Sequence, residues 1–412
     1  MFSVYANAFR VKDIRTKLLY VLLVLLIFRI GSQIPIPGVD MSLITPPEMG
    51  FIGVIVGGEM GTIFAMGIGP YITASIIMQL LGVAVPYLEN LKKEGEEGRK
   101  KINQYTRILA VAMSILQAAG TVFSLQGAFI YPNFFVYALA ALTMITGTMF
   151  IMWMSELLTE KAIGNGASFI IFANILSRLP IGVLTMYDAS LGGILNAILV
   201  IVALILFVFI IAFTVHVQEG QRKIPVQYSK KMVGKSLHGG QSSFIPVKVN
   251  IAGVMSIIFA MSLLGFPAQL SMFFPNSAPL ASAAQFLSIT APVGAILYVI
   301  LIFAFTFFYT SFAVNPVEMA ENLKKNGGFI PGIRPGRPTS DYISRVVNRL
   351  SWIGAVFYAL IAMIPVIIEW TFGIAVGFGG TTLLIVVGVA LELVNQLESQ
   401  LLMRNYKGFL SA

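Results

Sequence analysis

The sequence contains no cysteine and only two histidines, His216 and His238. Without cysteine the chain can form no disulfide, thiolate nucleophile or thiolate metal site, and two histidines leave no His-Glu-x-x-His motif or catalytic triad to find. Charged residues are also scarce, at 11% of 412 residues, while 57% are hydrophobic. A soluble domain carries about 25% charged residues. The composition therefore predicts an integral membrane protein that is not an enzyme and needs no metal or cofactor.

Long apolar runs set the expected fold class. A helix that crosses the hydrocarbon core needs about 20 mostly apolar residues. Ten runs of this kind occur, at 18–35, 70–87, 106–126, 134–158, 168–187, 191–216, 250–271, 292–315, 349–369 and 373–400. We therefore expect an all-α integral membrane protein with ten transmembrane helices.

The basic residues lie on one side of this arrangement. If the N-terminus is inside, 25 of the 27 Lys and Arg residues fall in or beside the inner segments, and Arg29 and Arg178 lie within runs. The inner segments are 1–17, 88–105, 159–167, 217–249, 316–348 and 401–412. Lys and Arg collect in cytoplasmic loops of membrane proteins, so both termini should be cytoplasmic.

Ten spans divide at the outer turn near residues 188–193 into two sets of five. Because five is odd, structural repeats of this size would have to be inverted, and inverted halves commonly enclose a path between them. We expect an N-terminal half at 1–190 and a C-terminal half at 191–412.

The apolar segment 51–68 cannot be a further span. Span 1 ends outside and the basic loop 88–105 must be inside, so only one crossing is allowed between them. Irregular, glycine-rich backbone at membrane depth is tolerated inside protein or beside water. We therefore expect a re-entrant segment with a short helix near Met60 to Met66. The alternative is a loop on the outer surface.

Two cytoplasmic segments, 217–249 and 316–348, are each 33 residues long, which exceeds what joining adjacent helices requires. In the first, extended patches at 224–228 and 244–249 flank Gly239 and Gly240 and predict a hairpin with a basic face. In the second, Arg334 stands between two Pro-Gly turns. The plain alternative is that the charges only set topology or touch anionic lipid. The length and the turns favour docking of a cytosolic partner.

Motifs for other activities are missing. The glycine-rich region 50–69 has no lysine, so it is not an ATP-binding P-loop, and 162–168 lacks the third glycine of a dinucleotide fingerprint. One alternative is a secondary transporter or lipid flippase, which a titratable pair at mid-membrane would favour, and this chain shows the reverse. Another alternative is a membrane scaffold, which would not need a re-entrant segment. Isoleucine pairs at i, i+4, such as Ile72 with Ile76 and Ile171 with Ile175, suit either a lined path or ordinary packing.

Several distinctive stretches resemble the SecY/Sec61-alpha family, whose members form the pore of protein-conducting channels. They are PIPG at 35–38, FAMGIGPYITASIIMQLL at 64–81, KKEGEEGRKKINQYTR at 92–107, AIGNG at 162–166, EGQRKIPVQYSKK at 219–231, NPVEMAENLKK at 315–325 and PGIRPGRPT at 331–339. The resemblance implies a channel that passes unfolded polypeptides across the cytoplasmic membrane of a bacterium and releases transmembrane segments sideways into the bilayer.

The resemblance also implies roles for particular residues. A pore ring would be formed by Ile72, Ile76, Ile171, Ile175, Ile258 and Ile385. A plug at about 57–67 would include Gly57, Gly58, Met60, Thr62, Ile63 and Phe64. A lateral gate would use Gln79, Gln117 and Asn315. Partners would dock on Arg222, Lys223, Lys230, Lys231, Arg334 and Arg337. The implied partners are SecE, SecG, the SecA ATPase, the ribosome, signal peptides, translocating polypeptides and anionic lipids, with no sequence-specific binding of nucleic acid.

Overall fold

The computed structural model describes residues 11–44, 61–162, 164–177, 194–228, 231–233, 236–238, 242–273, 277–372 and 380–410. The chain forms two compact units. The first consists of Met1–Leu184, Gly265–Ser288 and Val389–Ala412, and the second of Thr185–Leu264 and Ile289–Gly388. The division into inverted halves at 190/191 stays a prediction.

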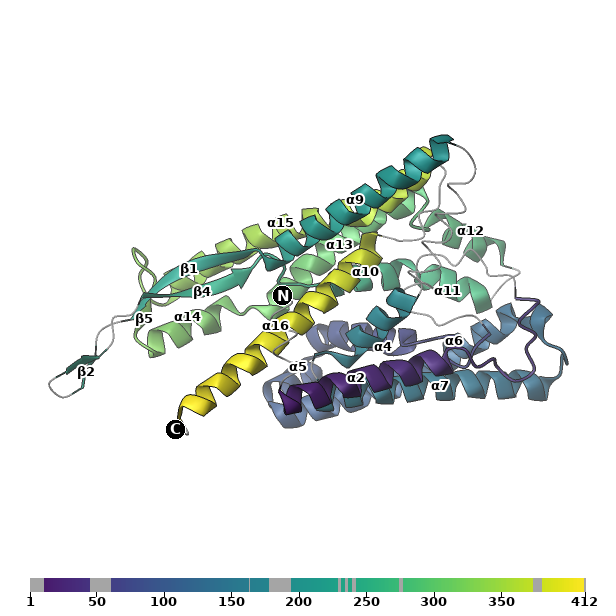
Figure 1. Cartoon of the computed structure of the whole chain (residues 1–412), viewed down its shortest axis with the longest axis horizontal. Helices are drawn as coiled ribbons and strands as arrows, with labels where there is room; N and C mark the ends of the chain where they lie inside the picture. The colour runs from purple at the N-terminus through teal and green to yellow at the C-terminus, as the bar shows by residue number, and fades with distance from the viewer. Residues whose placement is uncertain are drawn as a thin grey trace. The chain divides into compact units, whose positions relative to one another are not determined.

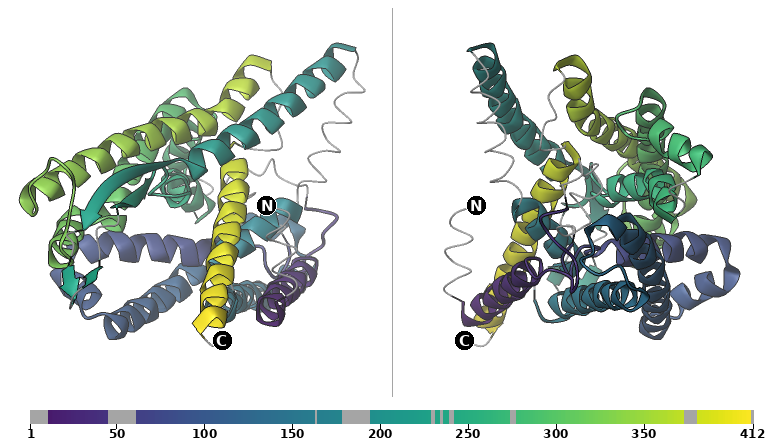
Figure 2. Two further views of the ribbon diagram at one scale, coloured as in Figure 1. Left: turned by 60° about the vertical axis from the view of Figure 1, so that its left-hand side comes forward. Right: turned by 90° about the vertical axis from the view of Figure 1, so that its right-hand side faces the viewer.

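The named elements described in the first unit are all helices, joined by turns and by two isolated β-bridges. Its helices are α2 (Lys12–Gly31), α4 (Gly69–Ala84), α5 (Pro86–Lys93), α6 (Glu96–Ser124), the short 3-10 helix η1 (Gln126–Ala128), α7 (Phe134–Lys161), the helix Gly166–Ser177, α11 (Phe266–Phe273) and α12 (Ala278–Phe286). Helix α6 packs between α4 and α7, α2 packs against α7, and α11 packs against α6 (Figures 1 and 2). Helix α16 (Gly380–Leu410) contains the boundary at residue 388 and contributes its second part to this unit.

The second unit combines helices with a small sheet. Its helices are α9 (Ile194–Glu219), α10 (Met255–Leu264), α13 (Pro292–Ala313), α14 (Pro316–Lys325) and α15 (Arg337–Phe372). Its strands are β1 (Gln221–Tyr228), β2 (Lys231–Val233), β3 (Ser236–His238), β4 (Ser242–Lys248) and β5 (Gly328–Phe329). Strand β1 pairs antiparallel with β4 and with β5, and β2 pairs with β3. The predicted hairpin in 217–249 is confirmed.

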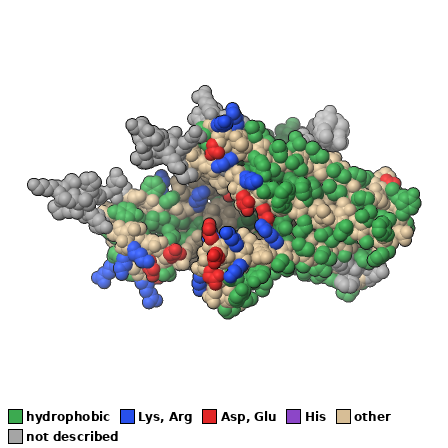
Figure 3. Space-filling view, turned by 90° about the horizontal axis from the view of Figure 1, so that it is seen from below, with side chains coloured by type: hydrophobic (Ala, Val, Ile, Leu, Met, Phe, Trp, Pro, Cys, Tyr) green, Lys and Arg blue, Asp and Glu red, His purple; other side chains and the backbone are tan. Residues whose placement is uncertain are grey.

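The all-α membrane fold is confirmed as well. Each of the ten apolar runs overlaps a described helix. Among the described residues, five helical stretches are long and apolar enough to span a membrane: Glu96–Ser124, Phe134–Lys161, Pro292–Lys325 (α13 followed by α14), Arg337–Ile367 and Thr381–Leu401. On the face seen in Figure 3, hydrophobic side chains cover wide areas, whereas the Lys, Arg, Asp and Glu side chains gather in clusters. Such a surface suits contact with lipid, and the protein is a multi-pass membrane protein.

Proline determines where the second predicted span ends. Pro86 is at the start of α5, and Val85 before it is extended, at φ −106° and ψ 112°. A residue that precedes proline is pushed out of the helical region by a steric clash. Helices α4 and α5 therefore meet at 97° instead of forming one straight helix.

The connecting segments 88–105 and 316–348 contain helices that the search for apolar runs did not indicate. Helices α5 and α6 fill most of the first segment, and α14 with the start of α15 fills much of the second. The described part of the expected short helix near Met60 to Met66 is a series of turns over 61–68. Gly61 and Gly67 have positive φ, at 82° and 52°, which is incompatible with a right-handed helix. Residues 45–60 lie outside the described residues.

Candidate functional site

The two long connecting segments, 217–249 and 316–348, form one structure, which we call the sheet module: β1, β4, β5, α14 and residues 337–350 of α15. Strand β1 comes from the first segment and pairs with β5 from the second, in the strand order β4-β1-β5. A single apolar core joins strands and helices. It consists of Ile224, Val226, Val247, Leu323, Ile330, Ile343, Val347 and Leu350. The module is therefore a folded platform, and the sequence indicated only two separate loops.

The outer face of this sheet carries basic and apolar side chains together. Ile224 and Val226 face the core of the sheet module, whereas Lys223 lies on the opposite face and is exposed. Arg222, near the start of β1, is also exposed, but it lies on the same face as Ile224 and pairs with Val247. The Lys223 ammonium lies 4.8 Å from the ring centroid of Phe244, a cation–π distance. The sequence did not predict Phe244 as a docking residue, although an aromatic residue at the start of the extended patch 244–249 could have indicated one. For the other two predicted docking residues in the hairpin, Lys231 lies in β2 and Lys230 lies outside the described residues.

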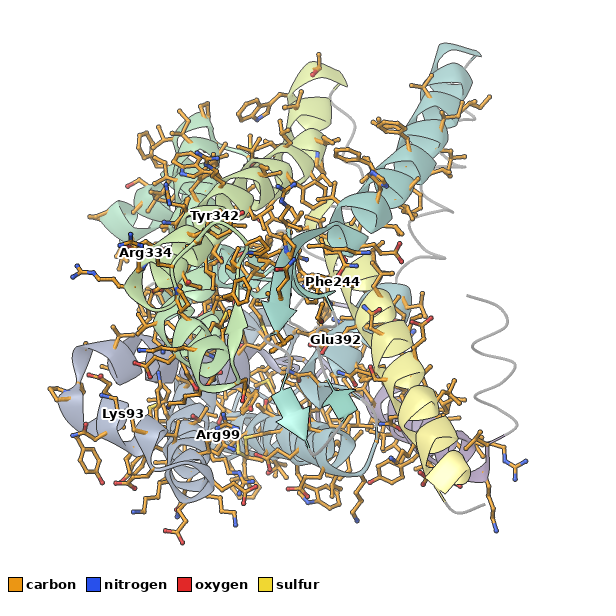
Figure 4. The ribbon with its side chains drawn as sticks, turned by 90° about the vertical axis from the view of Figure 1, so that its left-hand side faces the viewer. Lys93, Arg99, Phe244, Arg334, Tyr342 and Glu392 are labelled. Atoms are coloured by element: carbon orange, nitrogen blue, oxygen red, sulfur yellow. The ribbon has the colours of Figure 1, made fainter. Side chains whose placement is uncertain are left out.

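Arg334 lies on a turn of the sheet module, as predicted. Gly332 and Gly336 on either side have φ values of 80° and 102°, which glycine adopts without strain. The Thr339 hydroxyl donates a hydrogen bond to the Arg334 carbonyl oxygen at 2.9 Å, which ties the turn to the first turn of α15. The Arg334 side chain is exposed, and so is that of Arg337. Arg334, Phe244 and Tyr342, all from this module, are labelled in Figure 4.

The basic residues near α5 and α6 differ because several are paired with acids. Lys93 Nζ lies 2.7 Å from Glu89 Oε1, and this hydrogen bond lowers the pKa of the Glu89 carboxyl. Arg107 Nε lies 2.7 Å from Glu156 Oε1 and joins α6 to α7. Glu156 therefore has a structural partner near the C-terminal end of α7.

The six isoleucines predicted for the pore ring are all buried. Ile72 and Ile76 lie in α4, Ile171 and Ile175 in the helix Gly166–Ser177, Ile258 in α10 and Ile385 in α16. In α4 and in Gly166–Ser177 the two isoleucines are one helical turn apart and share a helix face. Four of the six belong to the first unit and two to the second. Their role as a ring stays a prediction.

The predicted gate residues have separate partners. Gln117 Nε2 in α6 donates a hydrogen bond to Gln269 Oε1 in α11 at 3.3 Å. Gln79 Nε2 donates to the Ser75 hydroxyl one turn earlier in α4, at 3.2 Å. Asn315 caps α14, since its side-chain oxygen accepts the backbone N–H of Glu318 at 3.4 Å. Gln269 was missed from the sequence, although a glutamine in a short apolar helix is a signal for a polar contact within the membrane.

The predicted plug residues fall into two groups. Gly57, Gly58 and Met60 lie outside the described residues. Thr62, Ile63 and Phe64 lie in the turns before α4, where Thr62 and Phe64 are buried.

Comparison with known proteins agrees with this description. Residues 62–394 match the sequence profile of the SecY family. The protein translocase subunit SecY of Halalkalibacterium halodurans is 44% identical, and the alignment covers 100% of both chains. A solved SecY structure aligns with a TM-score of 0.68 at 21% identity, over 92% of this chain and 91% of the other. The plug domain of that SecY protein is described as stabilising the closed state of the translocation channel and maintaining a membrane seal.

A third relative is Sec61 in the canine ribosome-channel complex from the endoplasmic reticulum, with a TM-score of 0.63 at 20% identity, over 92% of this chain and 91% of the other. These two structures share the fold, and the full-length match to the bacterial subunit carries the family assignment. Because the profile and that alignment together cover the spans and the sheet module, the chain belongs to the SecY family and is the pore-forming subunit of a protein translocase.

Proposed function

We propose that unfolded polypeptides cross the membrane through a constriction lined by Ile72, Ile76, Ile171, Ile175, Ile258 and Ile385. Isoleucine has no atom that can coordinate an ion. A narrow apolar ring therefore excludes ions by dewetting when it is empty, and it can yield around an extended chain. In this proposal the re-entrant segment seals the outer side of the constriction at rest, as the plug domain is said to do in the solved SecY relative.

The observation that supports a channel that also opens sideways is the hydrogen bond between Gln117 of α6 and Gln269 of α11. Two neutral amides make a weak link between helices, worth about 0.6 kcal/mol on average in membrane proteins. A channel that must open sideways needs a contact that is formed at rest and is broken at small cost. We therefore propose that α6 and α11 are parts of the lateral gate, with Gln269 added to Gln79 and Gln117. Asn315 contributes through its cap on α14.

We further propose that the sheet module receives the partner that delivers the polypeptide, either the SecA ATPase or the ribosome. Exposed Arg222 and Lys223 supply positive charge, and the rigid turn presents the guanidinium of Arg334. Arg337 is the first residue of α15. A positive charge at the N-terminus of a helix interacts unfavourably with the helix dipole, so the charge of Arg337 does not stabilise α15. A ribosome is named with the Sec61 relative, which supports the same kind of contact here.

The remaining assignments follow the same family resemblance. We propose that the chain works in the cytoplasmic membrane of a bacterium with both termini in the cytoplasm, in complex with SecE and SecG. Signal peptides open the channel in this proposal, and anionic lipids contact the basic cytoplasmic side. The strong excess of Lys and Arg in the inner segments supports this orientation.

The test is reconstitution of the chain with SecE and SecG in vesicles that contain anionic lipid. After addition of SecA and ATP, a precursor that bears a signal peptide should become protected from external protease. The same precursor without its signal peptide is the control and should stay accessible. Equal protection of both, or of neither, contradicts the proposed function.

A further inference from the structure

The side chain of Phe64 occupies a closely fitting site between two helices. It is 3% exposed. Its ring stacks on Phe28 of α2 at a centroid distance of 5.9 Å and on Phe150 of α7 at 6.1 Å, with interplanar angles of 5° and 15°. Phe64 therefore lies in the middle of a stack of three rings that joins the turns before α4 to both helices.

Two glycines make room for Phe64 and the preceding residue. A Cβ atom on Gly31 of α2 would lie 2.1 Å from Cε2 of the Phe64 ring, and one on Gly147 of α7 would lie 2.1 Å from the Ile63 carbonyl oxygen. Real Cβ atoms do not approach other heavy atoms so closely. Both helices thus contact residues 63 and 64 at a distance that only glycine allows. We call this arrangement the Phe64 socket: Phe28, Gly31, Gly147 and Phe150.

The backbone beside the socket is held as well. The N–H of Ile36 donates to the Gly61 carbonyl oxygen at 2.8 Å, and the N–H of Ile63 donates to the Ile34 carbonyl oxygen at 3.0 Å. Between these bonds, Pro35 and Thr62 form an antiparallel bridge. Residues 61–63 are therefore attached to the segment that leaves α2, independently of the aromatic stack.

From these contacts we infer that residues 61–64 are a stationary mount for the re-entrant segment, with Phe64 as its positioning residue. The inference rests on the proposed sealing role of that segment and changes the part assigned to three of its residues. Thr62, Ile63 and Phe64 stay bound to α2, α7 and the segment that follows α2 while the channel opens, instead of moving with the seal. A seal needs a fixed point from which it returns to the same place, and the socket provides one.

A disulfide between positions 35 and 62 tests whether the mount moves. Facing residues of an antiparallel pair have Cα atoms about 4.5–5.5 Å apart, which lies within the range that a disulfide spans. The chain has no native cysteine, so the variant Pro35→Cys/Thr62→Cys carries only the new pair. We expect the disulfide to form on oxidation and precursor uptake to be the same in oxidised and reduced vesicles. The single variants Pro35→Cys and Thr62→Cys are the controls.

Two results would overturn the inference. Failure of the disulfide to form would mean that residues 35 and 62 are not neighbours. Loss of uptake on oxidation, restored by reductant, would mean that Thr62 has to move. Neither result bears on whether the chain conducts polypeptides, since that is judged from uptake by the wild-type vesicles. If the wild type takes up no precursor, the proposed function fails, while formation of the disulfide still tests whether residues 35 and 62 are neighbours, as the mount requires.

A second pair of variants avoids cysteine. Gly147→Ala places a methyl group against the Ile63 carbonyl, whereas a Cβ atom at Gly127 has no neighbour within 4 Å. We expect Gly147→Ala to displace Phe64 and raise the resting ion conductance severalfold, and Gly127→Ala to leave it unchanged. Wild-type conductance in a folded Gly147→Ala variant would show that the socket does not position the seal.

Discussion

The hydrogen bond between Gln117 and Gln269 makes a quantitative prediction about gating. Replacement of either residue by leucine keeps a similar volume and removes the amide. In each single variant the remaining amide loses its partner in the closed state, whereas both amides of the wild type are paired there at 3.3 Å. We therefore expect each single variant to destabilise the closed state, and the double variant Gln117→Leu/Gln269→Leu to recover much of the loss because two leucines pack together.

The size of the effect follows from the position of the pair. Both side chains are half-buried between α6 and α11. Interhelical hydrogen bonds in membranes contribute about 0.6 kcal/mol on average and up to about 1.7 kcal/mol. A loss of about 1 kcal/mol raises the ratio of open to closed channels about fivefold. Two independent losses of this size would multiply to about 25-fold, so a double variant well below that value reports coupling between the two residues.

The assay is the open probability of single channels in a planar bilayer without substrate. Uptake of a precursor with a weakened signal peptide is the second readout, because an easier gate should admit it. Gln285→Leu in α12 serves as a matched control outside this pair. The reasoning is refuted if the single variants open no more often than the wild type, or if the double variant equals the product of the single ones.

Three further predictions concern the sheet module and the constriction. Arg334→Glu should abolish SecA-driven uptake and Arg334→Lys should impair it, because lysine cannot replace the planar guanidinium. The control Lys324→Glu should have a mild effect on uptake. Normal uptake by Arg334→Glu would mean that the turn is only a topology signal. Serine at both Ile171 and Ile258 should wet the ring and raise resting ion leak with uptake largely intact, and unchanged conductance would contradict the ring. Ile343→Ala removes a fully buried side chain from the module core and should destabilise it by about 2–5 kcal/mol, measured as faster limited proteolysis of β1 and β4; unaltered proteolysis would mean that the core does not hold the sheet.

The sequence alone determined the fold class, the approximate spans and the hairpin. Lipid requires long apolar runs, and those runs are visible residue by residue. The hairpin was visible for a similar reason, since the patches at 224–228 and 244–249 are rich in strand-forming residues and are separated by glycine. These features depend on neighbours along the chain. The same dependence limits the prediction. A search for apolar runs does not detect charged helices such as α5, so these helices were not predicted.

Only the tertiary structure decided which distant residues act together. Ile224 and Ile343 lie in one core, Gln117 bonds Gln269, and Phe64 stacks on Phe28 and Phe150, yet no spacing in the sequence relates the members of these groups. In the sequence, nothing distinguishes Gly31 and Gly147 from other small residues in apolar runs. The structure shows that a side chain at either position would collide with Phe64 or with the Ile63 carbonyl. Such contacts depend on how helices pack against one another. Periodicity along one helix indicates which face is apolar, but it does not specify which residue of another helix lies against that face.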